Sequence, residues 1–376
     1  MLKRFIFATV LIIKKRKMKK NLRNILVLAM GLMTTVSFAQ DWNVDSRTRI
    51  DMSEANSKAV EGDMMSTSQR ATVGATWGGS DWSIHASSDV NYTFTDGTSG
   101  VLSAKVYEAY ASTDLMGYAS VTAGRQALDY GSGAIISSNQ WGANRTSWDG
   151  FTFGLNLDMA DVTLGYASST DSISGENGSN SQMWLNAAKG EGDWNANLLY
   201  VSTTEGAADA MTAMGLDLSY AMMGGDLNLN VSYNTADALD GSDKDMDMTM
   251  IGATYNVNES MSISGSQTTY GENGFDVGSA SMGGYASSGS LGYLGADDVN
   301  MAIGGAYAMG DFTLGATMNM ITNEGDGVTA IEDRDVMDIS VGYTMSANAN
   351  LSISMATDTQ GDAETKYMWI TLNVMP

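Results

Sequence analysis

The sequence predicts an all-β fold: a closed antiparallel transmembrane β-barrel of about eighteen strands, with sixteen as the alternative count. Three features of the chain lead to this prediction. Apolar and polar residues alternate through most of it, polar loops of two different lengths separate the alternating segments, and its 376 residues include a single Pro. Because Pro interrupts hydrogen-bonded β-ladders, its scarcity favours long continuous strands.

Alternation with a period of two is the pattern of a strand whose two faces meet different surroundings. Around a turn at Gly310-Asp311, the apolar positions are Met301, Ile303, Tyr307 and Met309, then Phe312, Leu314, Ala316, Met318 and Met320. The same pattern recurs in residues 150–168, 214–234 and 338–358, and helical spacing fits none of these segments. Each segment therefore predicts a β-hairpin.

The chemistry of the two faces indicates a membrane rather than a protein core. One face carries Met, Leu and Val, whereas the other carries Asn, Ser, Thr, Gly and Asp. Strands of about ten residues cross a bilayer at a tilt, and a closed barrel leaves no unpaired backbone group in hydrocarbon. A soluble β-sandwich or adhesin is the alternative, but it favours shorter strands.

Tyrosines recur at two heights along the predicted strands. One set is Tyr220, Tyr255, Tyr307 and Tyr343, and the other is Tyr166, Tyr200, Tyr233 and Tyr270. Because the amphipathic Tyr ring favours membrane–water interfaces, two such sets predict one ring of Tyr at each interface.

Two kinds of connection alternate along the chain. Eight short turns fall at 79–81, 113–117, 159–161, 190–193, 223–225, 257–260, 310 and 346–348. Nine long polar loops fall at 53–69, 95–103, 127–146, 170–181, 203–212, 235–245, 271–298, 323–335 and 359–364. We expect short periplasmic turns and long extracellular loops. An even strand count puts both chain ends on the same side.

The first 39 residues have the composition of a secretory signal peptide. Nine Lys and Arg precede an apolar run at residues 25–36, and Ser37-Phe38-Ala39 is a small-x-small cleavage site. We expect cleavage after Ala39, with Met18 as an alternative start and an uncleaved anchor as the alternative interpretation. Residues 40–376 then form a single barrel domain in the outer membrane of a Gram-negative bacterium.

Composition excludes several classes of function. The formal charge of −23, from 43 acidic residues against 20 Lys and Arg, argues against nucleic-acid binding. One His and no Cys cannot supply a zinc site, and we expect neither metal nor cofactor. His85-x-Ser87 has the spacing of a phospholipase dyad, but strand parity turns the pair inward, away from lipid. Asp243-x-Asp245-x-Asp247 hints at a calcium loop, but Met248 stands where the Gly is needed and no Glu follows at the required distance, which favours a solvated acidic loop. We expect no enzyme activity.

Strand parity also selects candidate pore-lining residues. Arg47, Arg49 and Arg70 point inward on adjacent predicted strands and form a basic stripe opposite a mostly acidic wall. The full candidate set is Arg47, Arg49, Arg70, Glu108, Arg125, Asp158, Asp217 and Asp338, with the parity of Arg125 ambiguous. One hypothesis is a transverse field that filters solutes by charge. The alternative is that the arginines balance nearby carboxylates or anchor the long loop 127–146.

Loop 127–146 is unusually apolar for a solvated segment. It contains Ile135, Ile136 and Trp141 within the run "GAIISSNQWGAN". We interpret it as a constriction loop that folds into the lumen, with Tyr130, Ile135, Ile136, Trp141 and Arg145 as its candidate residues. Packing on the barrel rim or on a neighbouring subunit is the alternative.

About fifty residues from Tyr107 onward resemble a known family. The matching positions are Glu108-Ala109-Tyr110, Gly124-Arg125-Gln126, Tyr130-Gly131-Ser132-Gly133, Trp141, Asn144-Arg145 and Trp148-Asp149-Gly150. In this order they resemble the alginate-export and related porin-like outer-membrane barrels. The resemblance implies a barrel of about eighteen strands that conducts solutes passively. Scarce cations argue against a polyanionic substrate.

We therefore expect an outer-membrane porin, a passive diffusion channel for small hydrophilic solutes. The excess of acidic residues predicts a preference for cations and neutral solutes. Its expected partners are outer-membrane lipid and small solutes or ions, and a homo-oligomer is left open. The alternative function is a structural or adhesive barrel whose acidic surface loops bind ligands.

Overall fold

The computed structural model describes residues 39–54, 65–94, 102–171, 178–204, 211–237, 245–325 and 332–375. The expected signal peptide lies outside the described residues apart from Ala39. Asp243 and the centres of the acidic loops 235–245 and 323–335 lie outside them as well. From Asp41 onward the chain forms one compact unit.

Strands account for most of this unit. They are β1 (Ala39–Asp51), β2 (Ser66–Gly78), β3 (Trp82–Thr93), β4 (Leu102–Leu115), β5 (Ala119–Gln126), β6 (Trp148–Leu157), β7 (Ala160–Asp171), β8 (Gly178–Glu191), β9 (Trp194–Thr204), β10 (Met211–Met222), β11 (Leu227–Asp237), β12 (Asp245–Asn258), β13 (Met261–Tyr270), β14 (Asp298–Met309), β15 (Phe312–Asn323), β16 (Arg334–Ser346), β17 (Ala349–Gln360) and β18 (Ala363–Val374).

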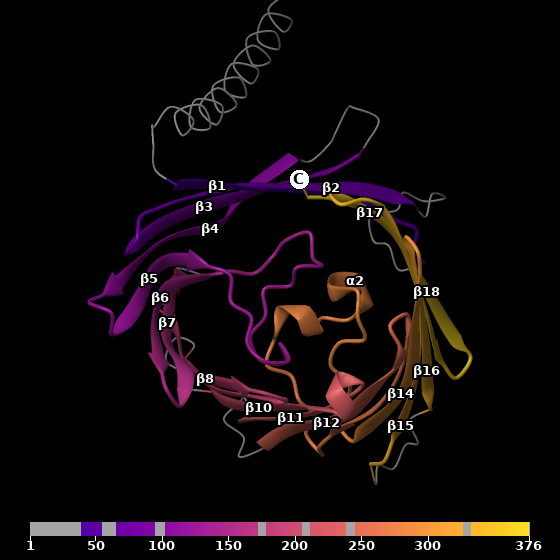
Figure 1. The fold of residues 1–376 in the computed structure, drawn as a ribbon. Helices are drawn as coiled ribbons and strands as arrows, with labels where there is room; N and C mark the ends of the chain where they lie inside the picture. Colours follow the sequence, from indigo (N-terminus) through magenta and orange to yellow (C-terminus); the bar gives the residue numbers. More distant parts are fainter. Residues whose placement is uncertain are drawn as a thin grey trace, which may run out of the picture. The chain divides into compact units, whose positions relative to one another are not determined.

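The eighteen strands form one closed antiparallel barrel. Each strand pairs with its sequence neighbours, and β18 closes the ring by pairing with β1 in a register that runs from Ser46 opposite Val374 to Asp51 opposite Trp369. The ring is visible from indigo β1 round to yellow β18 (Figure 1). The predicted fold class and strand count are confirmed. The start of β1 and the end of β18 lie at the same end of the barrel, also as predicted.

Every predicted short turn is present at the expected hairpin. One predicted long loop, 359–364, is wrong: β17 runs to Gln360 and β18 begins at Ala363, so only Gly361 and Asp362 connect them. The polar residues on both sides continue the ladder, pairing Asp358 with Thr365 and Thr359 with Glu364. The strands extend beyond the band of apolar residues. A polar stretch at the end of a strand therefore does not by itself indicate a loop.

The outer face of the barrel carries the large apolar side chains. Leu, Ile, Met and Val positions on alternate residues are exposed, among them Val73, Ile84, Leu164, Leu218, Ile251, Ile303, Leu314 and Ile339. Seven of the eight predicted Tyr of the two rings are exposed on this face. The prediction is wrong for the eighth, Tyr270, which is 3% exposed and points into the barrel, opposite Met248. Exposed apolar side chains all round the ring agree with a lipid-facing surface.

In the part of the chain that the structure describes, helical structure is confined to short turns. These are η1 (Met223–Gly225), η2 (Ala280–Met282) and α2 (Tyr285–Ser288). Within the described residues, no helix has the length and apolar character needed to span a bilayer. The last two elements belong to the segment 271–297, which lies inside the ring of strands (Figure 1).

Candidate functional site

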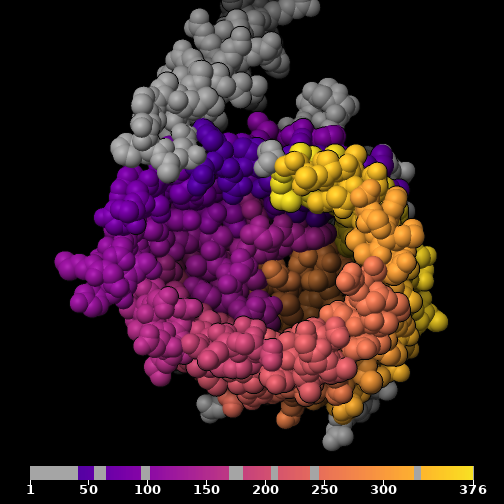
Figure 2. All heavy atoms as spheres, viewed as in Figure 1, coloured from indigo at the N-terminus to yellow at the C-terminus, as the bar shows by residue number. Residues whose placement is uncertain are grey.

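Two connecting segments occupy part of the barrel interior. Segment 127–147 joins β5 to β6, segment 271–297 joins β13 to β14, and both lie within the ring of strands (Figure 1). The loop expected at 127–146 is therefore inside the barrel rather than on its rim. The space-filling view shows a hollow beside them, bounded by the barrel wall (Figure 2).

Three arginines of the wall bind the backbone of segment 127–147. Arg47 donates to the carbonyl oxygens of Gln140 at 3.2 Å, Trp141 and Gly142 at 3.0 Å. Arg70 reaches two of these carbonyls, Gln140 at 3.0 Å and Gly142 at 2.9 Å. Arg49 donates to the Trp141 carbonyl at 3.1 Å, and its guanidinium carbon lies 3.7 Å from the centroid of that ring. This geometry supports the alternative prediction, in which the arginines anchor the loop.

The fourth arginine of this cluster, Arg145, comes from the loop itself. It forms a buried ion pair with Asp89 on β3 and lies 3.5 Å above the ring of Tyr107 on β4. Tyr107 faces inward because β4 bulges there: Ser87 pairs with Glu108, and Ser88 pairs with Val106. A bulge turns two consecutive residues toward one face. Tyr107 and Glu108 therefore both point into the lumen.

His85 lies beside the start of the loop. Its Nδ1 is 2.8 Å from the Thr76 hydroxyl, and its Nε2 is 3.6 Å from Glu108. Glu108 accepts the backbone N–H of Ala127 at 3.3 Å. His85 and Ser87 are both buried and inward, as parity predicted. The histidine is thus part of the wall that positions the loop.

The tip of segment 127–147 is held by the opposite wall. Asp217 on β10 accepts the backbone N–H of Ser132 at 2.9 Å, and Asn197 pairs with Asp217 across the ladder. Gly131 has φ of +55°, and a Cβ there would lie 1.9 Å from the Asp217 carboxylate. Glycine is therefore required for this close approach. Asp217 anchors the loop as well as facing the lumen.

Two tyrosines anchor segment 271–297, one to the wall and one to segment 127–147. The Tyr285 hydroxyl donates to Asp338 on β16 at 2.8 Å, and the Tyr293 hydroxyl donates to the Ala134 carbonyl at 2.5 Å. Burial raises the pKa of both Tyr285 and Tyr293 above the ordinary value. Both hydroxyls therefore remain protonated donors at neutral pH.

The two inserted segments also bind each other. Ser137 and Ser279 share a hydrogen bond of 2.8 Å, and Asn139 donates to the Ser287 carbonyl at 3.0 Å. A Cβ on Gly289 would lie 2.2 Å from the Trp141 ring. The segments therefore form one body inside the barrel rather than two independent loops.

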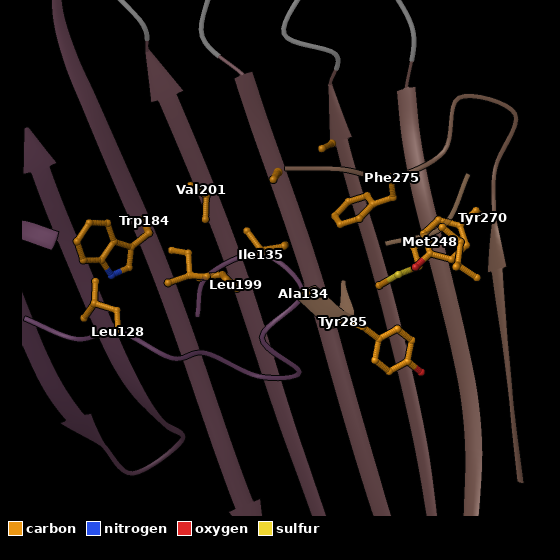
Figure 3. Packing of buried hydrophobic residues seen from close by; sticks show 14 of the residues in the cluster. Leu128, Ala134, Ile135, Trp184, Leu199, Val201, Met248, Tyr270, Phe275 and Tyr285 are labelled. Carbon is orange, nitrogen blue, oxygen red and sulfur yellow. The ribbon is translucent and has the colours of Figure 1, made fainter. Parts of the chain in front are cut away.

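A buried apolar cluster joins this body to one side of the wall. Ile135 and Leu128 of the first segment lie close to Trp184, Leu199 and Val201 of the wall (Figure 3). Phe275 and Tyr285 of the second segment lie beside Met248 and Tyr270 (Figure 3). Tyr130 accepts a hydrogen bond from the Trp184 indole at 3.0 Å, and burial raises its pKa. Burying these apolar surfaces stabilises the body in place.

Two predicted pore-lining residues lie elsewhere. Arg125 pairs with Asp149 across β5 and β6, on the same face as exposed Phe151 and Phe153, and is therefore on the outer surface. Asp158 lies in the exposed turn between β6 and β7, where its carbonyl accepts Lys189. The prediction that they line the lumen is wrong for both residues. Arg125 lies on the same face as the outward apolar side chains of β6, and Asp158 lies beyond the end of its strand.

Polar cavities remain between the inserted body and the wall. One lies below the tip at Ser132 and is lined by inward residues of β7 to β12, including Asp161, Asn195, Asn197, Asp217 and Asn230. Another lies along the wall from β12 to β18 and is lined by residues including Thr254, Ser264, Thr317, Asp338 and Ser340. Most of these side chains are small and polar, and Lys189 is the one cation among the described lining residues of the two cavities, beside several carboxylates. Such a surface suits hydrated solutes.

No family model and no curated protein matches the chain. Solved structures do match. OccK5 (OpdH) of Pseudomonas aeruginosa gives a TM-score of 0.68 at 9% identity, covering 89% of this chain and 97% of that chain. OprD of the same species gives a TM-score of 0.66 at 10% identity, covering 91% of this chain and 95% of that chain. OccAB4 of Acinetobacter baumannii gives 0.65 at 12% identity, covering 90% and 98%. This chain therefore has the fold of the OprD and Occ outer-membrane barrels.

Sequence reasoning missed the second inserted segment. Residues 271–298 were expected to be a long polar loop, yet Phe275, Tyr285, Leu291, Tyr293 and Leu294 belong to the buried cluster or pack against it. The sequence contains a signal for this segment, namely large apolar residues within a predicted loop. The same signal identified segment 127–146. Asp89 and Tyr107 were also missed, since their partner Arg145 lies far away in the sequence.

Proposed function

We propose that this protein is an outer-membrane porin, a passive diffusion channel for small hydrophilic solutes. The observation that carries the proposal is the closed ring of eighteen strands with an apolar outer face and polar cavities inside it. A barrel of that size is too wide for its own side chains to fill. The inserted segments narrow it and leave a path lined by Asn, Ser, Thr and Asp.

The charges that face the cavities support a preference for cations and neutral solutes. Asp161, Asp217 and Lys189 line one cavity and Asp338 lines the other, so carboxylates outnumber cations among their described lining residues. Arg47, Arg49 and Arg70 donate to loop carbonyls and are at most 8% exposed, so they present little charge to a passing solute. The transverse-field hypothesis is therefore less well supported than loop anchoring.

The structural neighbours agree with transport of small molecules. OpdK of Pseudomonas aeruginosa, solved with vanillate, matches with a TM-score of 0.68 at 11% identity, covering 90% of this chain and all of that chain. The neighbours named above are of the OprD and Occ type, and the more specific resemblance to alginate exporters stays a prediction.

Planar-bilayer recording tests the channel. Purified protein should give discrete conductance steps, and a KCl gradient should give a reversal potential of the sign expected for cations. Liposome swelling with sugars of increasing size should report a size cut-off. Absence of both conductance and swelling would contradict the proposal.

A structural or adhesive barrel is the second candidate. The buried apolar cluster that joins the inserted segments to the wall favours it, because a well-packed interior obstructs flow. In that case bilayers containing the protein would stay silent, while the acidic surface loops would still bind ligand.

Location and processing complete the proposal. Export to the outer membrane requires removal of the leader, which we place after Ala39, and N-terminal sequencing of mature protein from outer-membrane fractions tests that position. Cross-linking in the same fractions tests for a homo-oligomer.

A further inference from the structure

A third cavity lies between the two inserted segments and the wall, and its lining differs from that of the polar cavities. Met248, Met250 and Tyr270 come from the wall, and Met282, Leu291 and Leu294 come from segment 271–297. Ser132, Ser232 and Met250 line both this cavity and the polar one below the loop tip. A solute in the polar cavity therefore borders directly on an apolar recess.

The recess selects against ions. None of its described lining residues is Asp, Glu, Lys, Arg or His, so an ion entering it would lose hydration without gaining a partner. Flexible Met side chains adapt to flat apolar surfaces, including aromatic rings. The surface therefore favours an uncharged apolar group.

Its volume limits the size of the guest. The recess measures about 210 Å³. An apolar protein cavity of roughly 150 Å³ accommodates benzene. One substituted six-membered ring therefore fits within the recess.

Among the polar residues that line the recess, one carries a buried side-chain oxygen without a hydrogen-bond partner. Asn300 lines the recess, is 6% exposed, and its Oδ1 has no hydrogen-bond partner in the protein. Its Nδ2 donates to Asn319 Oδ1 at 3.1 Å. A buried acceptor without a partner costs free energy, so it favours a guest that donates to it.

A chain of hydrogen bonds sets the orientation of this amide. Asp338, as a carboxylate, only accepts, and it receives both the Tyr285 hydroxyl at 2.8 Å and Asn319 Nδ2 at 3.2 Å. Asn319 must then present Oδ1 to Asn300, and Asn300 must present Nδ2 in return. If the Asn300 amide were flipped, its Oδ1 would face Asn319 Oδ1, and two acceptors would oppose each other. Its oxygen is therefore the atom left for a guest, which must supply an O–H or N–H group.

We propose that this recess is a binding subsite for small uncharged single-ring solutes that carry one hydrogen-bond donor, of the phenol class. The ring lies among the Met and Leu side chains, and its hydroxyl donates to Asn300 Oδ1. The subsite deepens the proposed channel function and rests on it, because solutes reach it through the lumen. It would retain such solutes during passage, whereas anions and sugars pass only through the polar cavities.

Single-channel recording of the full mature protein tests the subsite with four probes at neutral pH. Phenol should reduce the open current in a saturable manner. Anisole has a ring of similar size without a donor and should act at about five-fold higher concentration, the loss expected for one hydrogen bond. Benzoate and benzenesulfonate, which are both anionic, should leave the current unchanged.

Two variants identify the site. Asn300→Leu should remove the difference between phenol and anisole, whereas Asn228→Leu, the same change elsewhere on the inner wall, should preserve it. Leu291→Trp, which fills the recess from the inserted segment, should abolish the response to both probes while the channel still conducts.

The outcomes separate the subsite from the channel. Conductance with no phenol effect, or with equal effects of phenol and anisole, overturns the subsite and leaves the porin proposal standing. A protein that does not conduct overturns the porin proposal. In that case, saturation-transfer NMR of phenol on the detergent-solubilised protein tests the recess by itself. If phenol gives no transfer signal, or if Asn300→Leu leaves the signal unchanged, the subsite is overturned as well.

Discussion

Arg47 on β1 donates a hydrogen bond of 3.0 Å to the carbonyl oxygen of Gly142, which lies 95 residues further along the chain. With Arg49 and Arg70 it fastens the inserted loop to the wall through backbone atoms. Backbone carbonyls are present whatever the loop sequence. These three positive charges therefore serve first to shape the lumen.

Removing two of these arginines should widen the channel. Arg47→Ala combined with Arg70→Ala deletes several buried hydrogen bonds from charged donors, each contributing about 1.5–3 kcal/mol. We expect the loop to leave its position, with larger single-channel conductance and more current noise. Arg334→Ala, which breaks a pair with Asp358 in the wall, is the control. Unchanged conductance in the double variant would contradict the anchoring role.

The close approach of Gly131 to Asp217 gives a second test. Gly131→Ala and Gly192→Ala both place a side chain at a left-handed φ, +55° and +58°, at a cost of about 1–2 kcal/mol. Only Gly131→Ala also brings a Cβ against the Asp217 carboxylate, whereas Gly192 has nothing within 4 Å. We expect altered conductance for Gly131→Ala alone. Equal effects of the two changes would indicate that the loop tip tolerates displacement.

Ion selectivity should depend on carboxylates of the lumen and not on those of the turns. Asp161 faces the polar cavity, and Asp158 lies three residues earlier in the exposed turn. Asp161→Asn should move the reversal potential in a KCl gradient toward zero, because one fixed negative charge leaves the pathway. Asp158→Asn should move it less. The idea fails if both shift it equally.

Adjacent residues on β15 should differ sharply in their tolerance of charge. Met318 pairs with Ile303 and Met337, both exposed on the outer face, whereas Thr317 lines a lumen cavity. Met318→Arg should lower the free energy of unfolding in lipid by about 2–4 kcal/mol, as for a charge on the lipid face. Thr317→Arg should cost far less and reduce cation preference. Similar destabilisation by both would be incompatible with a hydrated lumen.

The barrel itself could be predicted from local patterns. Alternation of Met301, Ile303 and Tyr307 with small residues specifies a strand with one lipid face, and Gly310-Asp311 specifies its turn. Because the side-chain period of a strand is two, the same pattern also assigns the inner face. Arg47, Arg70 and Asp217 were placed inward for this reason, and the structure has them there. Arg125 was misplaced because Gly124 and Gln126 beside it show no apolar alternation.

The interior could be predicted only in part. Ile135 and Trp141 marked one loop as apolar, but no local signal says which wall residues receive it. Asp89 with Arg145 and Asn300 with Asn319 meet only after the ring has closed. Tyr107 faces inward because of a bulge whose register depends on the neighbouring strand.

The sequence by itself determined the alternation of faces, the turns and hence a barrel with lipid outside and polar residues within. Each of these depends on residues a few positions apart, whose relative directions are set by strand geometry. Only the tertiary structure decided what fills that barrel: two segments bound to each other, arginines engaged by backbone carbonyls, and an apolar recess beside a polar path. Those features require contacts between residues distant in the chain, which exist only once β18 has paired with β1.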